Sequence, residues 1–155
     1  MLYYQGYTVS FQEVPDEISL VIEIADCPYK CPGCHSPELQ KPAGRDLKID
    51  IVSIIREYSD VITCVCLMGT GRDQKSVINI ANLVHDLGFK AAVYTGSNHW
   101  GKLAKHFDYV KYGPYVEKLG GLDSPNTNQH MIKVISRGIF GFTYEDITDK
   151  FKRKY

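Results

Sequence analysis

Apolar residues in this chain fall into short runs of strand length, separated by segments whose apolar positions have helical spacing. Residues 7–14 alternate polar and apolar positions, which predicts a strand with one buried face. Apolar runs predict further strands at 18–25, 61–69, 89–96, 108–113 and 130–136. Between the strands, apolar positions three and four residues apart predict helices at 48–60, 74–88 and 99–107.

This alternation of strands and helices is typical of α/β proteins, in which βαβ units form a parallel sheet covered by helices. It predicts about five core strands besides the N-terminal strand, too few for a closed eight-stranded barrel. Ligands bind such sheets at the carboxyl ends of the strands. Three loops follow these ends, at residues 27–38, 68–73 and 95–98. We therefore expect one α/β domain over residues 1–155, with its function in these loops.

The first of these loops, CPYKCPGCHSPE, holds Cys27, Cys31 and Cys34 with the spacing C-x3-C-x2-C. Three thiolates from one loop can hold three irons of a [4Fe–4S] cluster and leave the fourth iron without a protein ligand. Structural zinc needs a fourth ligand, which His35 could supply although it directly adjoins Cys34. The CPGCH stretch also matches the C-x-x-C-H pattern of haem attachment. The residues favour the open cluster and leave zinc, haem attachment and thiol redox chemistry as alternatives.

Composition restricts the expected compartment and partners. Lys plus Arg and Asp plus Glu both number 18, and this zero net charge argues against a general nucleic-acid binder. The basic stretch 149–155 is interpreted as a solvated tail. The sequence shows neither a signal peptide nor an apolar run of the roughly 20 residues that span a membrane. We expect a cytoplasmic protein, where thiols stay reduced and clustered cysteines more often bind metal or do chemistry than form disulfides.

The cysteine loop resembles that of the radical S-adenosylmethionine superfamily, and more specifically that of the activating proteins of anaerobic ribonucleoside-triphosphate reductase. Gly33 precedes the third cysteine, and C-P-G-C followed by His or an aromatic residue is similar to this subgroup. AVYTG at 92–96 resembles the subgroup's strand ending in Tyr-Thr-Gly. Residues 108–131 resemble its closing stretch, with Gly-Pro, Leu-Asp-Ser and Thr-Asn-Gln elements. The resemblance covers residues 18–135.

The resemblance implies an open, partial β/α barrel with a [4Fe–4S] cluster on Cys27, Cys31 and Cys34. S-adenosylmethionine would bind the open iron, and one electron from the cluster would cleave it to methionine and a 5′-deoxyadenosyl radical. That radical would remove a hydrogen from a backbone glycine of the reductase, so the chain would be an oxidoreductase. A small electron-donor protein such as flavodoxin or ferredoxin would supply the electron. No catalytic residue beyond the cluster ligands is implied.

The loop after the second core strand departs from the family pattern. The family carries Gly-Gly-Glu/Asp-Pro there, at the amino group of the cofactor's methionine, whereas residues 68–73 read MGTGRD. Main-chain carbonyls are expected to carry this contact, with Asp73 assisting modestly. The residues expected at S-adenosylmethionine are Gly33, Cys34, His35, Gly69, Thr70 and Gly71.

The other cysteines and histidines have plainer interpretations. Cys64 and Cys66 alternate on an apolar strand, so we expect them on one buried face as structural thiols rather than as a second metal site. His85 is expected near a helix C-terminus, where its charge favours the helix dipole. Ordinary surface or packing roles are expected for His99, His106, His130 and the packing anchor Trp100.

Two questions remain open from the sequence. The turn-rich stretch 113–129 is either a cap on the sheet or part of the surface that meets the reductase. The chain could also be another small radical S-adenosylmethionine enzyme, or a non-enzymatic electron carrier or zinc module. Turnover of S-adenosylmethionine separates these functions, because a carrier whose cluster has four protein ligands would not cleave it.

Overall fold

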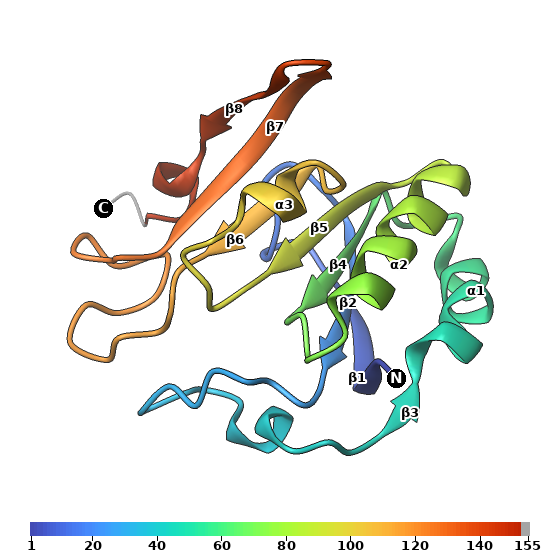
Figure 1. Cartoon of the computed structure of the whole chain (residues 1–155), viewed down its shortest axis with the longest axis horizontal. Helices are drawn as coiled ribbons and strands as arrows, with labels where there is room; N and C mark the ends of the chain where they lie inside the picture. The colour runs from blue at the N-terminus through green and yellow to red at the C-terminus, as the bar shows by residue number, and fades with distance from the viewer. Residues whose placement is uncertain (153–155) are drawn as a thin grey trace.

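The computed structural model describes residues 1–152, which form an open mixed β-sheet with three helices on one face (Figure 1). The spatial order of the strands is β3-β1-β2-β4-β5-β6-β7-β8. The strands are β1 (Tyr3–Ser10), β2 (Ser19–Ile24), β3 (Arg45–Asp46), β4 (Cys64–Met68), β5 (Lys90–Tyr94), β6 (Tyr109–Tyr112), β7 (His130–Gly138) and β8 (Gly141–Asp146). The helices are α1 (Leu47–Tyr58), α2 (Gln74–Asp86) and α3 (Gly101–Ala104), with 3-10 turns η1 (Pro37–Gln40) and η2 (Thr148–Phe151). No helix within residues 1–152 is long and apolar enough to cross a membrane.

The parallel core consists of β2, β4, β5 and β6, and this part confirms the predicted α/β class. All five predicted core strands are present, but the fifth, β7, runs antiparallel to β6, and the strands β3 and β8 were not predicted. The connection between β6 and β7, residues 113–129, contains no helix. A parallel partner would require a crossover, usually helical, whereas an antiparallel strand can follow a simple loop. The sheet therefore continues as a hairpin beside its parallel core.

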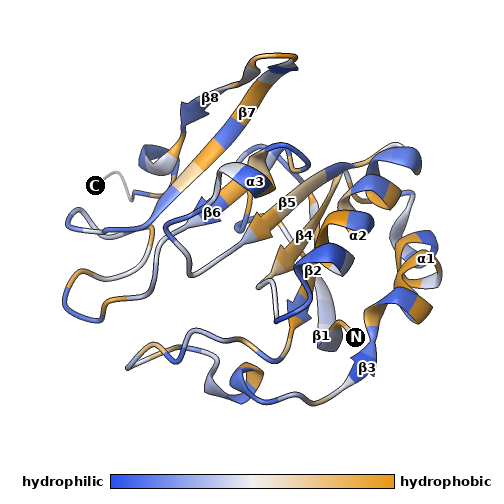
Figure 2. Cartoon of the chain, in the orientation of Figure 1, coloured by the Kyte–Doolittle hydropathy of each residue, from blue (hydrophilic) through white to orange (hydrophobic). Residues whose placement is uncertain are grey.

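Both faces of the parallel strands are buried, which explains their continuous apolar runs. Figure 2 shows this apolar character along β4 and β5. On one face, side chains such as Leu20, Val65 and Val93 pack against the three helices. The other face carries Val21, Cys64, Cys66, Ala92, Tyr109 and Met131, which are covered by Val14 and Ile147. We call this second face the inner face.

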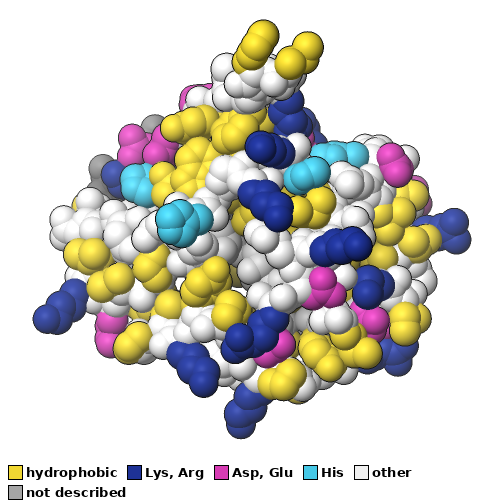
Figure 3. All heavy atoms as spheres, in the orientation of Figure 1, with side chains coloured by type: hydrophobic (Ala, Val, Ile, Leu, Met, Phe, Trp, Pro, Cys, Tyr) yellow, Lys and Arg dark blue, Asp and Glu magenta, His cyan; other side chains and the backbone are white. Residues whose placement is uncertain are grey.

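The β7–β8 hairpin was not predicted in full. β8 pairs with β7 and is largely exposed, and only Phe142 and Tyr144 alternate as large apolar positions within residues 141–146. At the hairpin tip, the side chains of Ile139 and Phe140 are fully exposed, and hydrophobic atoms project there at the top of Figure 3. The predicted solvated tail begins with η2, whose Phe151 packs on the inner face. The remainder of the tail, 153–155, lies outside the described residues.

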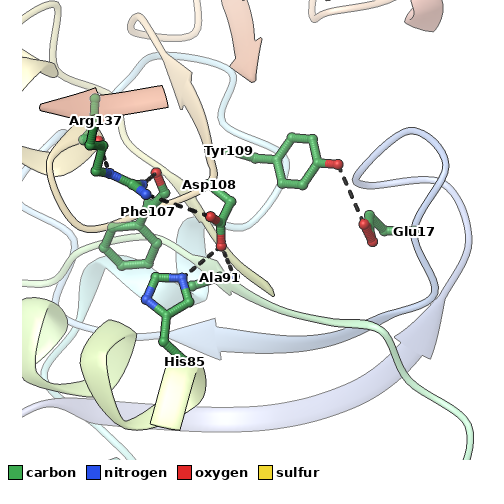
Figure 4. A network of polar contacts seen from close by, with 8 residues as sticks. Glu17, His85, Ala91, Phe107, Asp108, Tyr109 and Arg137 are labelled. Carbon is green, nitrogen blue, oxygen red and sulfur yellow. Dashed lines mark hydrogen bonds and ion pairs between the residues drawn. The ribbon is translucent and has the colours of Figure 1, made fainter. Parts of the chain in front are cut away.

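A polar network fixes the amino end of β6 (Figure 4). Asp108, directly before β6, accepts hydrogen bonds from the backbone N–H of Ala91 at 2.8 Å and contacts His85 Nε2 at 2.7 Å. Arg137 on β7 donates to the carbonyl oxygens of Ala104 and Phe107, and its Nη1 lies 3.8 Å from Asp108. His85 is in the last turn of α2, as predicted. The network joins α2, β5, β6 and β7 at the end of the sheet opposite the cysteine loop.

Candidate functional site

The cysteine loop leaves the carboxyl end of β2 and closes on itself. The N–H of Asp26 donates to the carbonyl of Lys41 at 3.0 Å, and the N–H of Cys27 donates to the carbonyl of Leu39 at 3.0 Å. Leu39 is buried and holds the returning segment against the sheet. The loop is therefore anchored at both ends, and in Figure 1 it crosses beyond the arrowheads of the parallel strands.

A tight turn brings Cys31 and Cys34 together. The N–H of Cys34 donates to the carbonyl of Cys31 at 3.2 Å across Pro32 and Gly33. Gly33 has φ +75°, and proline followed by a residue of positive φ is the signature of a type II turn. A Cβ at Gly33 would also lie 2.9 Å from the carboxylate of Glu117. The sequence C-P-G-C thus specifies the local geometry, and Gly33 lets the loop approach residues 113–129.

The three thiols are free and partly buried. The sulfur of Cys34 accepts the N–H of Ser36 at 3.4 Å. Burial is the main cause that raises the pKa of the Cys27 thiol, and negative charge on Cys31 and Cys34 raises it further. The three sulfurs therefore lie within electrostatic reach of one another.

Three cysteine thiols are the type of ligand that iron–sulfur clusters use. Within residues 1–152, no three His, Cys, Asp or Glu side chains are grouped so as to hold a metal ion. In a [4Fe–4S] cluster each thiolate binds a different iron, so its ligands stand further apart than those of one ion. His35 is exposed and packs against Tyr115, with their ring centroids 5.0 Å apart.

The glycine loop after β4 lies directly against the start of the cysteine loop. Gly69 and Gly71 have φ +118° and +55°, and a Cβ at Gly71 would come 3.1 Å from the carbonyl oxygen of Ala25. Only glycine allows this backbone conformation and approach without strain. An ion pair of 3.1 Å between Arg72 and Asp26 joins the two loops at the surface.

A cavity of about 340 Å³ opens between the predicted loops. This volume is at the lower end of the usual range for ligand cavities. It is lined by Pro28 and Tyr29 of the cysteine loop, by Thr70, Gly71, Arg72 and Gln74 after β4, and by Thr95, Ser97, His99 and Leu103. The three loops predicted from the carboxyl ends therefore meet at one cavity, and His99 lines it although only a surface or packing role was expected.

Residues 113–129 cap the sheet, which is one of the two roles considered for them, and they also lie against the cysteine loop. Leu122 packs on the inner face and so caps the sheet. Tyr115 and Glu117 lie against His35 and Gly33 of the cysteine loop. The stretch is therefore a cap that also forms one wall beside the three thiols.

Asp73 has a structural task in this geometry. Its carboxylate accepts hydrogen bonds from the backbone N–H of Ser76 at 3.1 Å and from the Ser76 hydroxyl at 2.6 Å. It is thus the N-cap of α2. The main-chain groups of Gly69, Thr70 and Gly71 stand closer to the cysteine loop, through the contacts of Gly69 and Gly71 with the end of β2.

Cys64, Cys66 and Trp100 occupy the packed positions that were expected for them. Cys64 and Cys66 are fully buried on the inner face, and burial raises the pKa of Cys64 to about 12. Trp100 stacks on Tyr112, with ring centroids 5.0 Å apart, and packs edge-on against Phe142. These residues contribute to packing.

Lys111 is the residue that sequence reasoning missed. Its side chain is 9% exposed on the inner face, near the carboxyl end of β6. The available signal was a single lysine within the strand DYVKYG, because Lys is rarely buried unless it is paired.

Comparison of the chain with protein-family models gave no match, and searches of the curated proteins and of the solved structures gave none either.

Proposed function

We propose that this chain is a cytoplasmic radical S-adenosylmethionine activase that generates the glycyl radical of anaerobic ribonucleoside-triphosphate reductase. The observation that carries the proposal is the placement of Cys27, Cys31 and Cys34. They are three free, partly buried thiols in one anchored loop at the carboxyl ends of parallel strands, beside a cavity of about 340 Å³. The open sheet is consistent with a partial β/α barrel of this superfamily, which is part of the proposal.

Each part of the site has a task in this proposal. Cys27, Cys31 and Cys34 would hold a [4Fe–4S] cluster, which when bound supplies the electron that cleaves S-adenosylmethionine to a 5′-deoxyadenosyl radical. The carbonyl groups of residues 69–71 can accept hydrogen bonds from the cofactor's ammonium, because glycine allows close approach. The Thr95 and Ser97 side chains bring hydroxyl groups to the cavity. The protein thus binds and orients the cofactor.

A protein substrate suits the open architecture. Eight strands in an open order leave the inner face to be covered by loops and not by a closed barrel. Residues 113–129 stand beside the thiols, where a glycine-bearing loop of the reductase would have to enter. A small one-electron donor such as flavodoxin or ferredoxin completes the proposed system.

The decisive experiment is anaerobic reconstitution of the protein with iron and sulfide, followed by reduction and addition of S-adenosylmethionine. We expect iron bound to the protein, formation of 5′-deoxyadenosine and, when the reductase is present, a glycyl radical visible by electron paramagnetic resonance. Cys34→Ala is expected to abolish all three, whereas Cys64→Ala retains them. Zinc in the purified protein together with failure to bind iron would contradict the proposal, as would a bound cluster that never cleaves S-adenosylmethionine.

A further inference from the structure

Lys111 lies in the interior at the level of the candidate site. It stands in register with Tyr94 on β5, which in turn stands opposite Met68 on β4. These are the last or nearly last residues of their strands, so Lys111 lies at the carboxyl end where the cysteine loop crosses. The side chain runs towards Gly113, the first residue of the 113–129 wall.

The ammonium of Lys111 has few partners for a buried charge. It donates one hydrogen bond, to the carbonyl of Gly113 at 3.2 Å, and lies 5.8 Å from the ring centroid of Tyr94. Among residues 1–152, no carboxylate lies within 4.0 Å of it. Since an ammonium has three donors, two remain without a protein acceptor in this region. A buried charge of this kind is costly unless an anion compensates it.

The anions that act on Lys111 belong to the cysteine loop. Burial lowers the pKa of Lys111 to about 8, and the negative charges of Cys31, Cys27 and Cys34 oppose this change. As cluster ligands the three cysteines would be negatively charged, so the occupied site would bring opposite charges into one partly dry region, where Coulomb interactions are stronger than in water.

We propose that Lys111 is the counter-charge of the cluster site: its buried ammonium, with two donors left open, compensates the negative charge of the three cysteine ligands and makes the bound cluster easier to reduce. The inference rests on the function proposed above. Reduction transfers one electron from an external one-electron donor to the cluster, which adds one negative charge beside the ammonium. Lys111 is therefore a positioning residue that acts through the cluster and forms no bond to substrate.

The first test uses the metal-free protein, where the counter-charge has no cluster to compensate. Lys111→Met removes the charge but keeps an unbranched side chain of similar length. We expect the urea midpoint of metal-free Lys111→Met to lie above that of the wild type, because the cost of burying the ammonium disappears. A lower midpoint would identify Lys111 as a structural residue and overturn the inference.

The second test uses the reconstituted protein and a redox titration with mediators. We expect Lys111→Met to shift the midpoint potential of the cluster to more negative values, with at least a tenfold smaller equilibrium constant for reduction, which is about 59 mV for one electron. Lys133→Met is the matched control. It removes one charge from the neighbouring strand β7, where Lys133 lies 6.0 Å from the Tyr109 ring centroid, and should leave the potential unchanged.

The outcomes separate the inference from the proposed function. An unchanged potential in Lys111→Met overturns the inference and leaves the function standing. If the wild type assembles no cluster, the proposed function fails and the inference fails with it. If Lys111→Met alone folds without assembling a cluster, Lys111→Arg decides: recovered assembly supports the need for a positive charge, and no recovery overturns it.

Discussion

The charged residues at the two ends of β6 differ in how many hydrogen-bond partners surround them. At the amino end, Asp108 is surrounded by donors from Ala91, His85 and Arg137. At the carboxyl end, the Lys111 ammonium is more deeply buried but has, among residues 1–152, only the Gly113 carbonyl as an acceptor. A satisfied polar network stabilises a fold, whereas an incompletely paired buried charge is retained at a cost to stability. The contrast indicates a stabilising network at the amino end and supports the proposal that the carboxyl end carries the chemistry.

The largest effect is expected from the carboxyl end. Replacement of Cys27, Cys31 or Cys34 by Ala should each reduce bound iron to background, because an open cluster has no spare protein ligand. The measurement is iron per folded protein after anaerobic reconstitution.

The buried cysteines are the control for this prediction. Cys64→Ala and Cys66→Ala should keep their iron, since burial raises both thiol pKa values and keeps them protonated. If either proves as necessary as the loop cysteines, the ligand assignment is wrong.

The amino end should respond in stability and not in cofactor binding. Asp108→Ala leaves the N–H of Ala91 and the ring nitrogen of His85 without this partner and removes the 3.8 Å ion pair with Arg137. We expect a loss of about 3 kcal/mol in the free energy of unfolding, measured with urea, and normal iron content per folded molecule. Asp86→Ala, at an exposed position in α2, should change stability by less than about 0.5 kcal/mol. Loss of iron from folded Asp108→Ala would contradict the interpretation that the amino end of β6 contributes stability and only the carboxyl end contributes to cofactor binding.

Gly96, in the loop after β5, lies against Tyr29 of the cysteine loop, and its substitution tests whether this contact holds that loop in place. A Cβ at Gly96 would lie 2.9 Å from the ring of Tyr29, so Gly96→Ala should displace the cysteine loop. We expect a cost of about 2 kcal/mol, typical of overpacking, and a slower or incomplete cluster assembly. Gly101→Ala is the matched control because nothing lies within 4 Å of its added Cβ. Equal behaviour of the two variants would show that the Tyr29–Gly96 contact does not hold the loop.

The smallest effect concerns the N-cap of α2 and depends on pH. Hydrogen bonds from Ser76 hold the pKa of Asp73 at about 2, below its ordinary value of 3.8. The ionised cap therefore stabilises the fold fully above pH 3.8, and this contribution is lost as the pH falls towards 2. Asn also caps helices, so the free energy of unfolding of Asp73→Asn should be close to that of the wild type at pH 7. Between pH 4 and pH 2 the variant should lose about 1 kcal/mol less of this free energy than the wild type. Urea titrations at both pH values would measure the difference.

Asp73→Asn also tests whether the main chain of residues 69–71, and not the Asp73 carboxylate, binds the cofactor. If main-chain carbonyls of residues 69–71 carry the cofactor contact, Asp73→Asn should weaken S-adenosylmethionine binding by about tenfold or less, on the order of 1.4 kcal/mol. Isothermal titration with the reconstituted protein measures this. A much larger loss would mean that the carboxylate does more than cap α2.

Apart from the two-residue strand β3, the order of strands and helices through β6 could be predicted because each element carries its own local signal. Burial on both faces makes β2, β4 and β5 continuously apolar, and amphipathic spacing marks α1 and α2. The loop C-P-G-C likewise contains its turn in its own residues, Pro32 and Gly33. The orientation of β7 carried no such signal, since strand pairing is a long-range property, and the alternation of Phe142 and Tyr144 in β8 was too short to predict a strand.

The sequence by itself determined that three thiols stand in one loop at the end of a strand, next to two other loops at neighbouring strand ends. Only the tertiary structure decided which charges meet there. The register of β5 and β6 places Lys111 over Tyr94 and within electrostatic reach of cysteines about eighty residues earlier in the chain. The same register places Asp108 against Ala91 and His85 at the other end. Local patterns report which face of an element is buried, but the partners of a buried charge are set by strands that pair across the whole chain.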